Sequence, residues 1–516
     1  MKRRALALLC AGILAVGMLA GCGGSSDKKD SSAKTEDPKK APSAQSSDDL
    51  VSAIRPIYEP LFAETKDGLE YYLADKLDIS EDGLTYTLHI NDKATWSDGE
   101  PVTVKDIKFT IDYGVLVYGG PTSFTKVNGG EVQINEIDDK TMEFVLPSVY
   151  DNYVRTLSQF YPMPAHAFDN DPSKIDDSTY FKTPGMATSG AYVVSEINED
   201  SFVYTARDDY YRGTPSVKKV VIKTIGSGST KQIEFENGGI DYMRVTSAED
   251  LKKYKEESDK YNMYSISEAR LNYLQLNPHG PVMSTLSQDA RKAIFLALDK
   301  DAIVDFAWGS DELAEPANSL ITPDQSIYNK NCKGYNFNLE EAKKLAKSSG
   351  LEGKELTYIY NSDRANMESV ATVVQQQLAE IGVTVNIESC DTSTFFPRFF
   401  ASKDKELATT WDLGTNGWDS QRGSNCGQAI SYFTNRLCDC GYSDEVSGLA
   451  QKAIGTADAK EKQELWNTIQ DKALEECWEY PLTYTNFVMV SQKNVTGLDG
   501  SSVVPEFIDY LSIHMD

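Results

Sequence analysis

Residues 367–387 read MESVATVVQQQLAEIGVTVNI, and this stretch decides the fold class. Apolar residues recur along its first part at steps of three and four, which predicts a helix with one buried face. These residues are Met367, Val370, Val374, Leu378 and Ile381. Gly382 then stops the helix, and the alternation over 383–387 predicts a strand. A helix joined through a glycine to a strand is the unit from which α/β domains are built, so we expect an α/β fold.

Other segments show the same two periods. Alternation of apolar and polar residues predicts strands over 84–90, 131–146, 191–206 and 217–225. Helical spacing predicts helices over 104–113, 289–308 and 340–349, and a helical pair over about 445–478. In the helix of 289–308 we expect one buried stripe, formed by Ile294, Leu298, Ile303 and Phe306.

Length and composition exclude several classes of protein. The chain has 516 residues, 40% of them apolar and 25% charged, which is typical of soluble proteins and too long for one compact core. A formal charge of −27 argues against a nucleic-acid partner, because a phosphate backbone needs a basic face. Four histidines leave little for a histidine-based catalytic or metal site, whereas 28 tyrosines suit a surface that recognises ligands.

The N-terminus has the pattern of an export signal. Lys2, Arg3 and Arg4 precede an uncharged run from Ala5 to Ala20 that is short for a transmembrane span. The run ends in Leu-Ala-Gly-Cys at 19–22, which looks like a bacterial lipobox. We therefore expect residues 1–21 to be a lipoprotein signal peptide, cleaved before Cys22, and Cys22 to carry diacylglycerol and further acyl chains such as palmitate. The alternative is an ordinary secretory signal in which Cys22 has no role.

The segment after Cys22 is predicted to be a tether. Residues 23–49 contain no Val, Ile, Leu, Met, Phe, Tyr or Trp, so they cannot bury enough surface to fold. We expect 22–50 to be a lipidated cysteine and a disordered tether that anchors a folded body to the bilayer.

Six cysteines follow Cys22, at 332, 390, 426, 438, 440 and 477. An exported protein with an even number of cysteines can form disulfides, and their pairing is left open. The most local candidate joins Cys426 to Cys438 or Cys440. A zinc site at 438–440 is disfavoured, because one intervening residue and no nearby histidine do not match zinc spacing. We expect no metal and no cofactor.

Several motifs in collinear order resemble one family. They include Tyr-Glu-Pro-Leu at 58–61, LDISEDGLTYTL at 77–88, WSDGEPVT at 96–103, TSGAY at 188–192, the run 208–219, NGGID at 237–241, DARKAI at 289–294, DKDAI at 299–303, NLEEA at 338–342 and QQL at 376–378. Over about 51–516 the chain resembles the extracellular solute-binding proteins, family 5, of ABC importers, of the oligopeptide- and dipeptide-binding type.

The resemblance implies a type II periplasmic-binding-protein-like fold, in which two α/β lobes and an extra domain are joined by a hinge and close on a ligand. By resemblance, lobe I comprises 51–64, 181–271 and 485–516. The extra domain comprises 65–180, and lobe II comprises 272–484.

The resemblance also implies a site in lobe II. Peptide-binding members have a Trp-x-x-Asp segment whose aspartate binds the ligand's α-ammonium group. Trp418 matches, but the third residue after it is Gln421 rather than Asp. Asp419 follows Trp418 directly, so on a strand it would face the other way. Either Asp419 binds the ammonium after a shift of register, or this chain binds a solute without a free amino terminus. Core packing is the other interpretation of Trp418.

Residues 268–273 correspond to a strand that lines the cleft in this family. Its two faces are predicted to carry Glu268, Arg270 and Asn272 on one side and Ala269, Leu271 and Tyr273 on the other. The charged face is interpreted as cleft lining, with a solvated edge strand as the alternative. Arg270 and Arg422 are the candidates for a ligand carboxylate, because a guanidinium group binds one with two hydrogen bonds. Tyr58 and Tyr192 lie in motifs that are more often structural.

The predicted function is capture of short peptides and delivery to an ABC permease by a monomeric, extracytoplasmic lipoprotein. The long polar tether suggests a Gram-positive cell surface, and the alternative is an outer or inner membrane of another bacterium. Alternatives are a non-peptide ligand such as a nickel chelate or oligosaccharide, a receptor that senses peptides, and an exported hydrolase. The hydrolase is disfavoured, since the chain has no Gly-x-Ser-x-Gly or His-Glu-x-x-His. Its acidic pairs, such as Asp138-Asp139, are neighbours on turns and lack the fixed separation that two catalytic carboxylates need. We therefore expect that the protein is not an enzyme.

Overall fold

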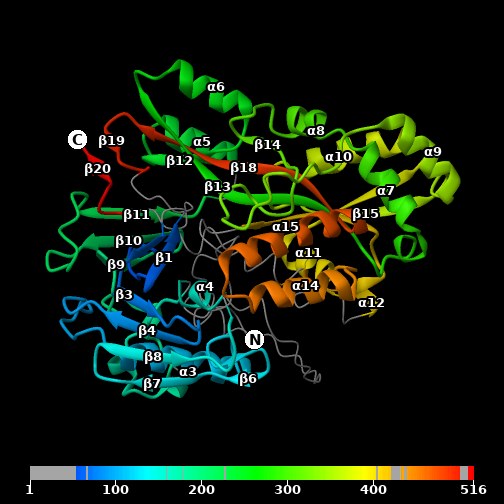
Figure 1. The fold of residues 1–516 in the computed structure, drawn as a ribbon. Helices are drawn as coiled ribbons and strands as arrows, with labels where there is room; N and C mark the ends of the chain where they lie inside the picture. The colour runs from blue at the N-terminus through cyan, green and yellow to red at the C-terminus, as the bar shows by residue number, and fades with distance from the viewer. Residues whose placement is uncertain are drawn as a thin grey trace, which may run out of the picture. The chain divides into compact units, whose positions relative to one another are not determined.

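A computed structural model describes residues 54–65, 68–150, 152–158, 160–176, 178–225, 228–401, 405–419, 431, 433–434, 439–499 and 509–516. These residues form two compact units. The colour bar of Figure 1 gives the residue numbers along the ribbon. Unit 1 holds the described residues up to Met243 and from Ser491 onward, and unit 2 holds Arg244–Val490. The structure thus assigns 244–271 to unit 2, and the division into two lobes and an extra domain stays a prediction.

Unit 1 contains two main antiparallel sheets. The first has the order β3-β4-β8-β7, and the second has the order β11-β10-β9. Their bounds are β3 Ala74–Ile79, β4 Thr85–Ile90, β7 Gln133–Glu136, β8 Thr141–Val145, β9 Tyr192–Ile197, β10 Ser201–Ala206 and β11 Lys219–Lys223. Alternation predicted strands in the segments of β4 and β7 to β11, although 131–146 and 191–206 each hold two strands, and β3 was not predicted. β4 shows the signal, since its buried and half-buried residues alternate.

Smaller elements complete unit 1. The short strands are β1 Phe62–Thr65, β2 Gly68–Tyr71, β5 Lys126–Val127, β6 Gly130–Glu131, β19 Val495–Thr496 and β20 His514–Met515. The helices are α3 Val104–Tyr118, α4 Tyr153–Ser158 and α5 Gly228–Glu236, with 3-10 turns at Ala165–Phe168, Pro172–Lys174 and Tyr180–Lys182. The helix α3 starts with a capping box between Thr103 and Asp106, and it extends beyond the predicted end at 113.

Two of the family motifs pack against each other inside unit 1. The Tyr58 hydroxyl donates to the carbonyl of Ala187 at 3.0 Å, and the Gly190 amide donates to the carbonyl of Ile57 at 2.9 Å. Tyr192 is fully buried, and its hydroxyl donates to the carbonyl of Val217 at 2.9 Å. Tyr58 and Tyr192 are therefore held by contacts of the fold, as their motifs indicated.

Unit 2 is built on a seven-stranded sheet with the order β12-β18-β13-β17-β15-β16, and β14 pairs with β18. The bounds are β12 Tyr242–Val245, β13 Tyr261–Leu276, β14 Ala314–Pro316, β15 Glu355–Asn361, β16 Thr384–Cys390, β17 Leu413–Asp419 and β18 Glu479–Gln492. β15 runs parallel to β16 and β17, whereas β13 and β17 are antiparallel. The helix α10, Met367–Ala379, connects β15 to β16, which confirms the α/β unit predicted at 367–387.

The other helices of unit 2 are α6 Ala248–Glu256, α7 Gln288–Ala297, α8 Lys300–Ala307, α9 Leu339–Ser349, α11 Thr392–Phe399, α12 Lys405–Ala408, α14 Asp444–Ile454 and α15 Ala459–Glu476, with a 3-10 turn at Met283–Thr285. α14 and α15 pack together as the predicted helical pair (Figure 1). Gly350, with a φ of 75°, ends α9 as predicted.

The single stripe predicted over 289–308 is wrong. Leu298 adopts an extended conformation, and the Asp299 side chain accepts a hydrogen bond from the Ala302 amide, which starts a second helix. The stripe is broken at this corner, so Phe306 is 59% exposed instead of buried.

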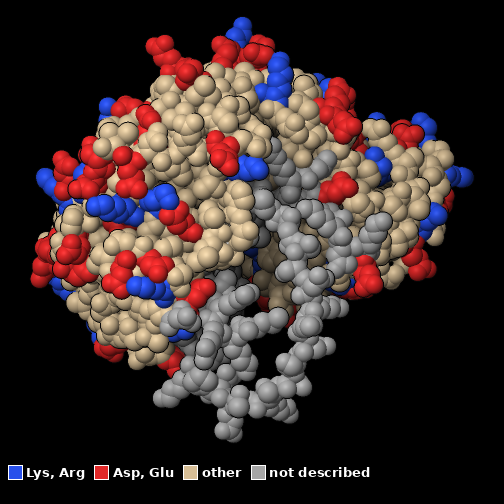
Figure 2. All heavy atoms as spheres, turned by 90° about the horizontal axis from the view of Figure 1, so that it is seen from below, with Lys and Arg blue, Asp and Glu red and all other residues tan. Residues whose placement is uncertain are grey.

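Charged side chains are interspersed over the face drawn in Figure 2, where Asp and Glu lie among Lys and Arg. On this face the described residues form no purely basic patch, which accords with a formal charge of −27. Among the described residues, no helix is both long enough and apolar enough to cross a membrane.

Candidate functional site

The pairing of β13 with β17 places the predicted site residues in register. Arg270 lies opposite Asp419, Leu271 opposite Trp418, and Tyr273 opposite Asn416. Asp419 is the last residue of β17, and the structure describes its backbone only. Gln421 and Arg422 lie outside the described residues.

One face of β13 carries a connected polar group. Arg270 Nε donates to Asn272 Oδ1 at 3.1 Å, and Asn272 Nδ2 donates to the Thr483 hydroxyl at 3.1 Å. Glu268, Arg270 and Asn272 are 5%, 5% and 2% exposed. Because β18 and β17 flank β13, this is an interior strand and not the solvated edge strand that the sequence left open. Burying these groups is tolerable because each has a partner: Arg270 bonds to Asn272, Asn272 to Thr483, and Glu268 to residues of the neighbouring strands.

Gly417 makes room for this polar face. A Cβ at Gly417 would lie 2.6 Å from Arg270 Nη2 and 2.7 Å from Asn272 Oδ1. Any other residue would displace one of these side chains, so the glycine fixes where the Arg270 guanidinium group lies.

Glu268 is engaged by neighbouring strands. Its Oε2 lies 2.8 Å from Arg244 Nη2 and accepts a hydrogen bond from the Thr485 hydroxyl at 2.7 Å. The Arg244 guanidinium carbon lies 4.4 Å from the centre of the Phe487 ring. A role of Glu268 in direct ligand contact stays a prediction.

The opposite face of β13 is apolar core. Leu271, Tyr273 and Trp418 are fully buried, and the rings of Tyr273 and Trp418 have centroids 5.0 Å apart. Tyr273 also contacts Phe399 edge-on, with centroids 6.4 Å apart. Core packing therefore accounts for the burial of Trp418 and Tyr273, and their contact with a ligand stays a prediction.

Sequence reasoning missed the partners of the polar face. Arg244, Thr483, Thr485 and Phe487 come from segments distant in sequence from 268–273. A signal was present, because Thr483, Thr485 and Phe487 alternate along one side of a strand. The pairing of that strand with β13, however, cannot be deduced from either segment alone.

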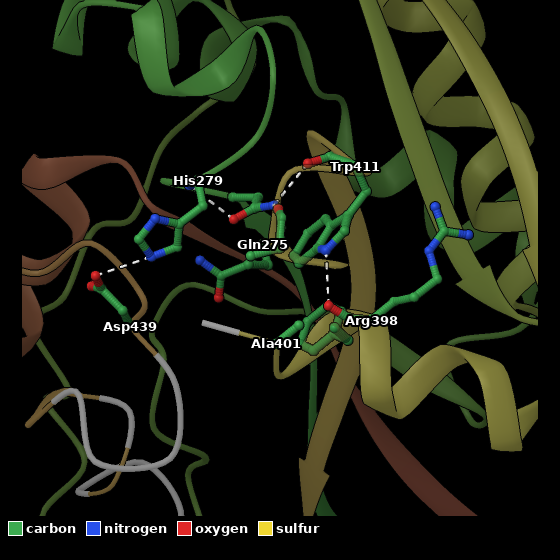
Figure 3. Close-up of a pocket in the computed structure, with 9 residues that line it drawn as sticks. Gln275, His279, Arg398, Ala401, Trp411 and Asp439 are labelled. Atoms are coloured by element: carbon green, nitrogen blue, oxygen red, sulfur yellow. Dashed lines mark hydrogen bonds and ion pairs between the residues drawn. The ribbon is translucent and has the colours of Figure 1, made fainter. Parts of the chain in front are cut away.

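A second missed feature is a small cavity in unit 2 beyond the polar face (Figure 3). Its lining residues are Gln275, Asn277, His279, Arg398, Phe399, Ala401, Ala408, Trp411 and Asp439. His279 Nε2 lies 3.0 Å from Asp439 Oδ2, as the dashed line in Figure 3 marks. The cavity has a volume of about 10 Å³, which is the space of about one water molecule, so it is too small for a peptide.

The cysteine predictions are tested only in part. Cys332, Cys390 and Cys477 are buried thiols that form no disulfide. Cys426 and Cys438 lie outside the described residues, as does Cys22, so the local disulfide and the lipid anchor stay predictions. In the part of the chain that the structure describes, no group of three His, Cys, Asp or Glu side chains is arranged to hold a metal ion.

Comparison with known families identifies the architecture. Residues 68–436 match the model of the bacterial extracellular solute-binding proteins, family 5 (middle region). The chain belongs to this family. As a family 5 protein it has the fold of the type II periplasmic binding proteins, which confirms the α/β class and the resemblance found in the sequence.

Known relatives of this family 5 protein agree with the assignment. The ABC transporter substrate binding protein CtaP from Listeria monocytogenes has a crystal structure that matches with a TM-score of 0.81 and 28% identity, over 91% of this chain and 95% of that one. A Brucella ovis protein named as an ABC transporter peptide-binding protein is 26% identical over 66% of this chain and 64% of its own length. The dipeptide-binding protein of Escherichia coli K12 is 23% identical over 77% of each chain.

Proposed function

We propose that this family 5 protein captures short peptides outside the cytoplasm and delivers them to an ABC permease. Membership of the family over residues 68–436 is the observation that carries the proposal. The names of the Brucella ovis and Escherichia coli relatives support peptides as the ligand class.

The polar face of β13 supports a defined polarity of the bound peptide. A guanidinium group presents a planar fork of donors that matches a carboxylate. Arg270 is placed by Asn272 and by the space above Gly417, so it is oriented before a ligand arrives. We propose that Arg270, with Arg422, binds the peptide carboxylate and that Asp419 binds the α-ammonium group.

Calorimetric titration with tetra-alanine and with its N-acetylated form tests this polarity. A charge-assisted hydrogen bond contributes about 1.5–3 kcal/mol, so acetylation should weaken binding about 10- to 100-fold. Asp419→Asn should weaken the free peptide similarly and leave the acetylated peptide unchanged. Equal affinity of both peptides for the unsubstituted protein would remove Asp419 from this role. It would favour a ligand without a free amino terminus, as Gln421 in place of the usual aspartate allows.

We further propose that the protein is a monomeric lipoprotein held on the cell membrane through Cys22 and the 22–50 tether. Two or more acyl chains hold a protein stably on a bilayer, whereas one does not. Mass spectrometry of the N-terminal peptide should show Cys22 as the first residue with its lipid. Cys22→Ala should release the protein into the medium, and a variant that stays on the membrane would contradict the anchor.

A further inference from the structure

Four side chains tie three neighbouring strands of the unit 2 sheet together. β12, β18 and β13 are adjacent in that order (Figure 1). Arg244 of β12 reaches over the Phe487 ring of β18 and pairs with Glu268 of β13 at 2.8 Å. The Thr485 hydroxyl of β18 donates to the same carboxylate oxygen at 2.7 Å. We call Arg244, Glu268, Thr485 and Phe487 the strap.

The strap lies where the chain passes between the two units. The chain leaves unit 1 after Met243 and returns to it after Val490, so the two crossings occur in β12 and in β18. Arg244 is the first residue of unit 2, and Phe487 shortly precedes the second crossing. The strap therefore ties both crossing strands to β13.

The chemistry of the strap favours one fixed geometry. The Glu268 side chain is 7% exposed and that of Arg244 is 31% exposed, so the pair is poorly screened by water. A planar guanidinium group stacked on a ring and bound to a carboxylate has less freedom than an ammonium group at the end of a flexible stem. Removing either charge would leave its partner poorly solvated, so the pair holds together as a unit.

A strained residue follows the strap directly. Ala269 has a φ of 48°, in the left-handed region that a Cβ disfavours, and it is buried. It separates Glu268, which binds β12 and β18, from Arg270, which bonds to Asn272. The local geometry of β13 is thus set by contacts on both sides of Ala269.

We propose that the strap positions the two crossing strands and thereby sets the affinity for the captured ligand. In this role Glu268 and Arg244 act as positioning residues, through β12 and β18. The effect on affinity rests on the proposed function, whereas the effect on the strands does not. If the crossing strands loosen, part of the free protein adopts conformations that do not bind the ligand. The apparent dissociation constant then equals the intrinsic constant divided by the fraction of molecules that can still bind.

Amide hydrogen exchange of Glu268→Gln and Arg244→Lys tests the positioning itself in the ligand-free protein. Each substitution keeps the size and a hydrogen-bonding group, so the variants should fold. We expect exchange to speed up at least tenfold in β12 and β18 and to stay unchanged in β15 and β16. Glu388→Gln is the control for loss of an ion pair elsewhere in the sheet, because Glu388 of β16, at the other end of the sheet, pairs with Arg398 of α11 at 3.0 Å.

Two results would overturn the proposal. Unchanged exchange in β12 and β18 would show that the strap does not hold the crossings. An equal increase in the exchange rate throughout unit 2 would show a general loss of stability and not the loss of a contact that positions β12 and β18.

Titration of the same variants with tetra-alanine reads out the functional consequence. We expect about tenfold weaker binding by Glu268→Gln and Arg244→Lys and wild-type binding by Glu388→Gln. Wild-type affinity in all three would overturn the link to ligand capture. Absence of binding by the unsubstituted protein would instead count against the proposed peptide function, and the exchange experiment would still decide the role of the strap.

Discussion

Glu479 is a buried carboxyl group at the start of β18. It is fully buried, and the Tyr442 hydroxyl donates to its Oε2 at 2.6 Å. Burial raises the pKa of Glu479 to about 8, because the charged form loses its hydration. The folded protein therefore keeps a proton on Glu479 at neutral pH, whereas the unfolded chain releases it near the usual glutamate pKa of about 4.3.

This difference in pKa predicts a pH-dependent stability. The folded state binds more protons between about pH 4.3 and pH 8, so the stabilising contribution is complete at low pH and is lost as the pH rises to about 8. Glu479→Gln should remove this dependence and make the protein more stable than the parent at pH 9, by up to about 5 kcal/mol. Urea unfolding at pH 5 and pH 9 measures how the free energy of unfolding changes with pH. Glu136→Gln, an exposed control, should leave the pH dependence in place. Parallel curves for Glu479→Gln and the parent would contradict the assignment.

Gly190 is a position where only a glycine fits. A Cβ there would lie 2.5 Å from the carbonyl oxygen of Pro56 and 2.8 Å from the carbonyl carbon of Ile57, and backbone atoms cannot turn away as a side chain can. Gly190→Ala should therefore destabilise the protein by about 2–3 kcal/mol. Gly448 in α14 has nothing within 4 Å of its added Cβ, so Gly448→Ala should be neutral or stabilise by up to about 1 kcal/mol. Chemical unfolding of both variants makes the comparison, and equal stabilities would contradict it.

At this scale the sequence identified motifs but not their partners. The motifs at 58–61 and 188–192 were recognised separately, yet nothing in either segment shows that Gly190 packs on Pro56 and Ile57. The same holds for the strap, since Arg244 and Phe487 meet only after the sheet has formed. Contacts between distant segments depend on strand order, which local patterns do not encode.

At the scale of elements, the corner between α7 and α8 depends on Asp299. Its side chain caps α8, and its backbone N–H and C=O are both bound by the Gln377 side chain of α10, at 3.0 and 3.2 Å. The run Leu-Asp-Lys-Asp at 298–301 carries the signal of a helix start, which the apolar period over 289–308 obscured.

Loss of this cap should have a moderate cost. Asp299→Ala should lower the free energy of unfolding by about 1 kcal/mol, because the Ala302 amide loses its acceptor. Asp305→Ala, on the exposed side of the same helix, should cost nothing or stabilise slightly, since alanine favours helix. Denaturant midpoints of the two variants test the cap. A larger loss at Asp305 than at Asp299 would contradict this explanation of the corner.

A strand with one exposed face such as β4 was predictable from alternation, but β18, which is buried on both faces, was not. β4 alternates, and its segment was recognised. β18 is buried along nearly its whole length, so its residues show no alternation of buried and exposed positions. Pro481 also lies within this strand. A proline in such a run normally argues against an interior strand, and here tertiary pairing prevails over that local preference. The strand at the centre of the strap was therefore absent from the sequence prediction.

At the scale of the molecule, the fold class and the family could be predicted from the sequence, but little of the site could. Motifs in collinear order indicated family 5, and the match over 68–436 confirms it. The candidate site could be placed on residues 268–273 and 418–422, but its geometry depends on Gly417, Thr483 and Arg244, which join it only in the folded sheet.

Ligand binding should make the protein more compact, since the resemblance implies lobes that close on the ligand. Small-angle scattering should therefore give a smaller radius of gyration for the protein saturated with tetra-alanine than for the ligand-free protein. The Asp419→Asn variant at the same peptide concentration serves as the control and should contract less, because it binds the peptide more weakly. A radius that does not change at saturation would contradict capture by closure.

The most direct test of peptide capture is native mass spectrometry of residues 23–516, produced without the lipid and purified gently from a peptide-rich medium. We predict a set of added masses that match di- to pentapeptides and disappear when the protein is unfolded and refolded. A single mass equal to that of the bare chain, from the same medium and under the same conditions, would contradict peptide capture and direct attention to chelates and oligosaccharides.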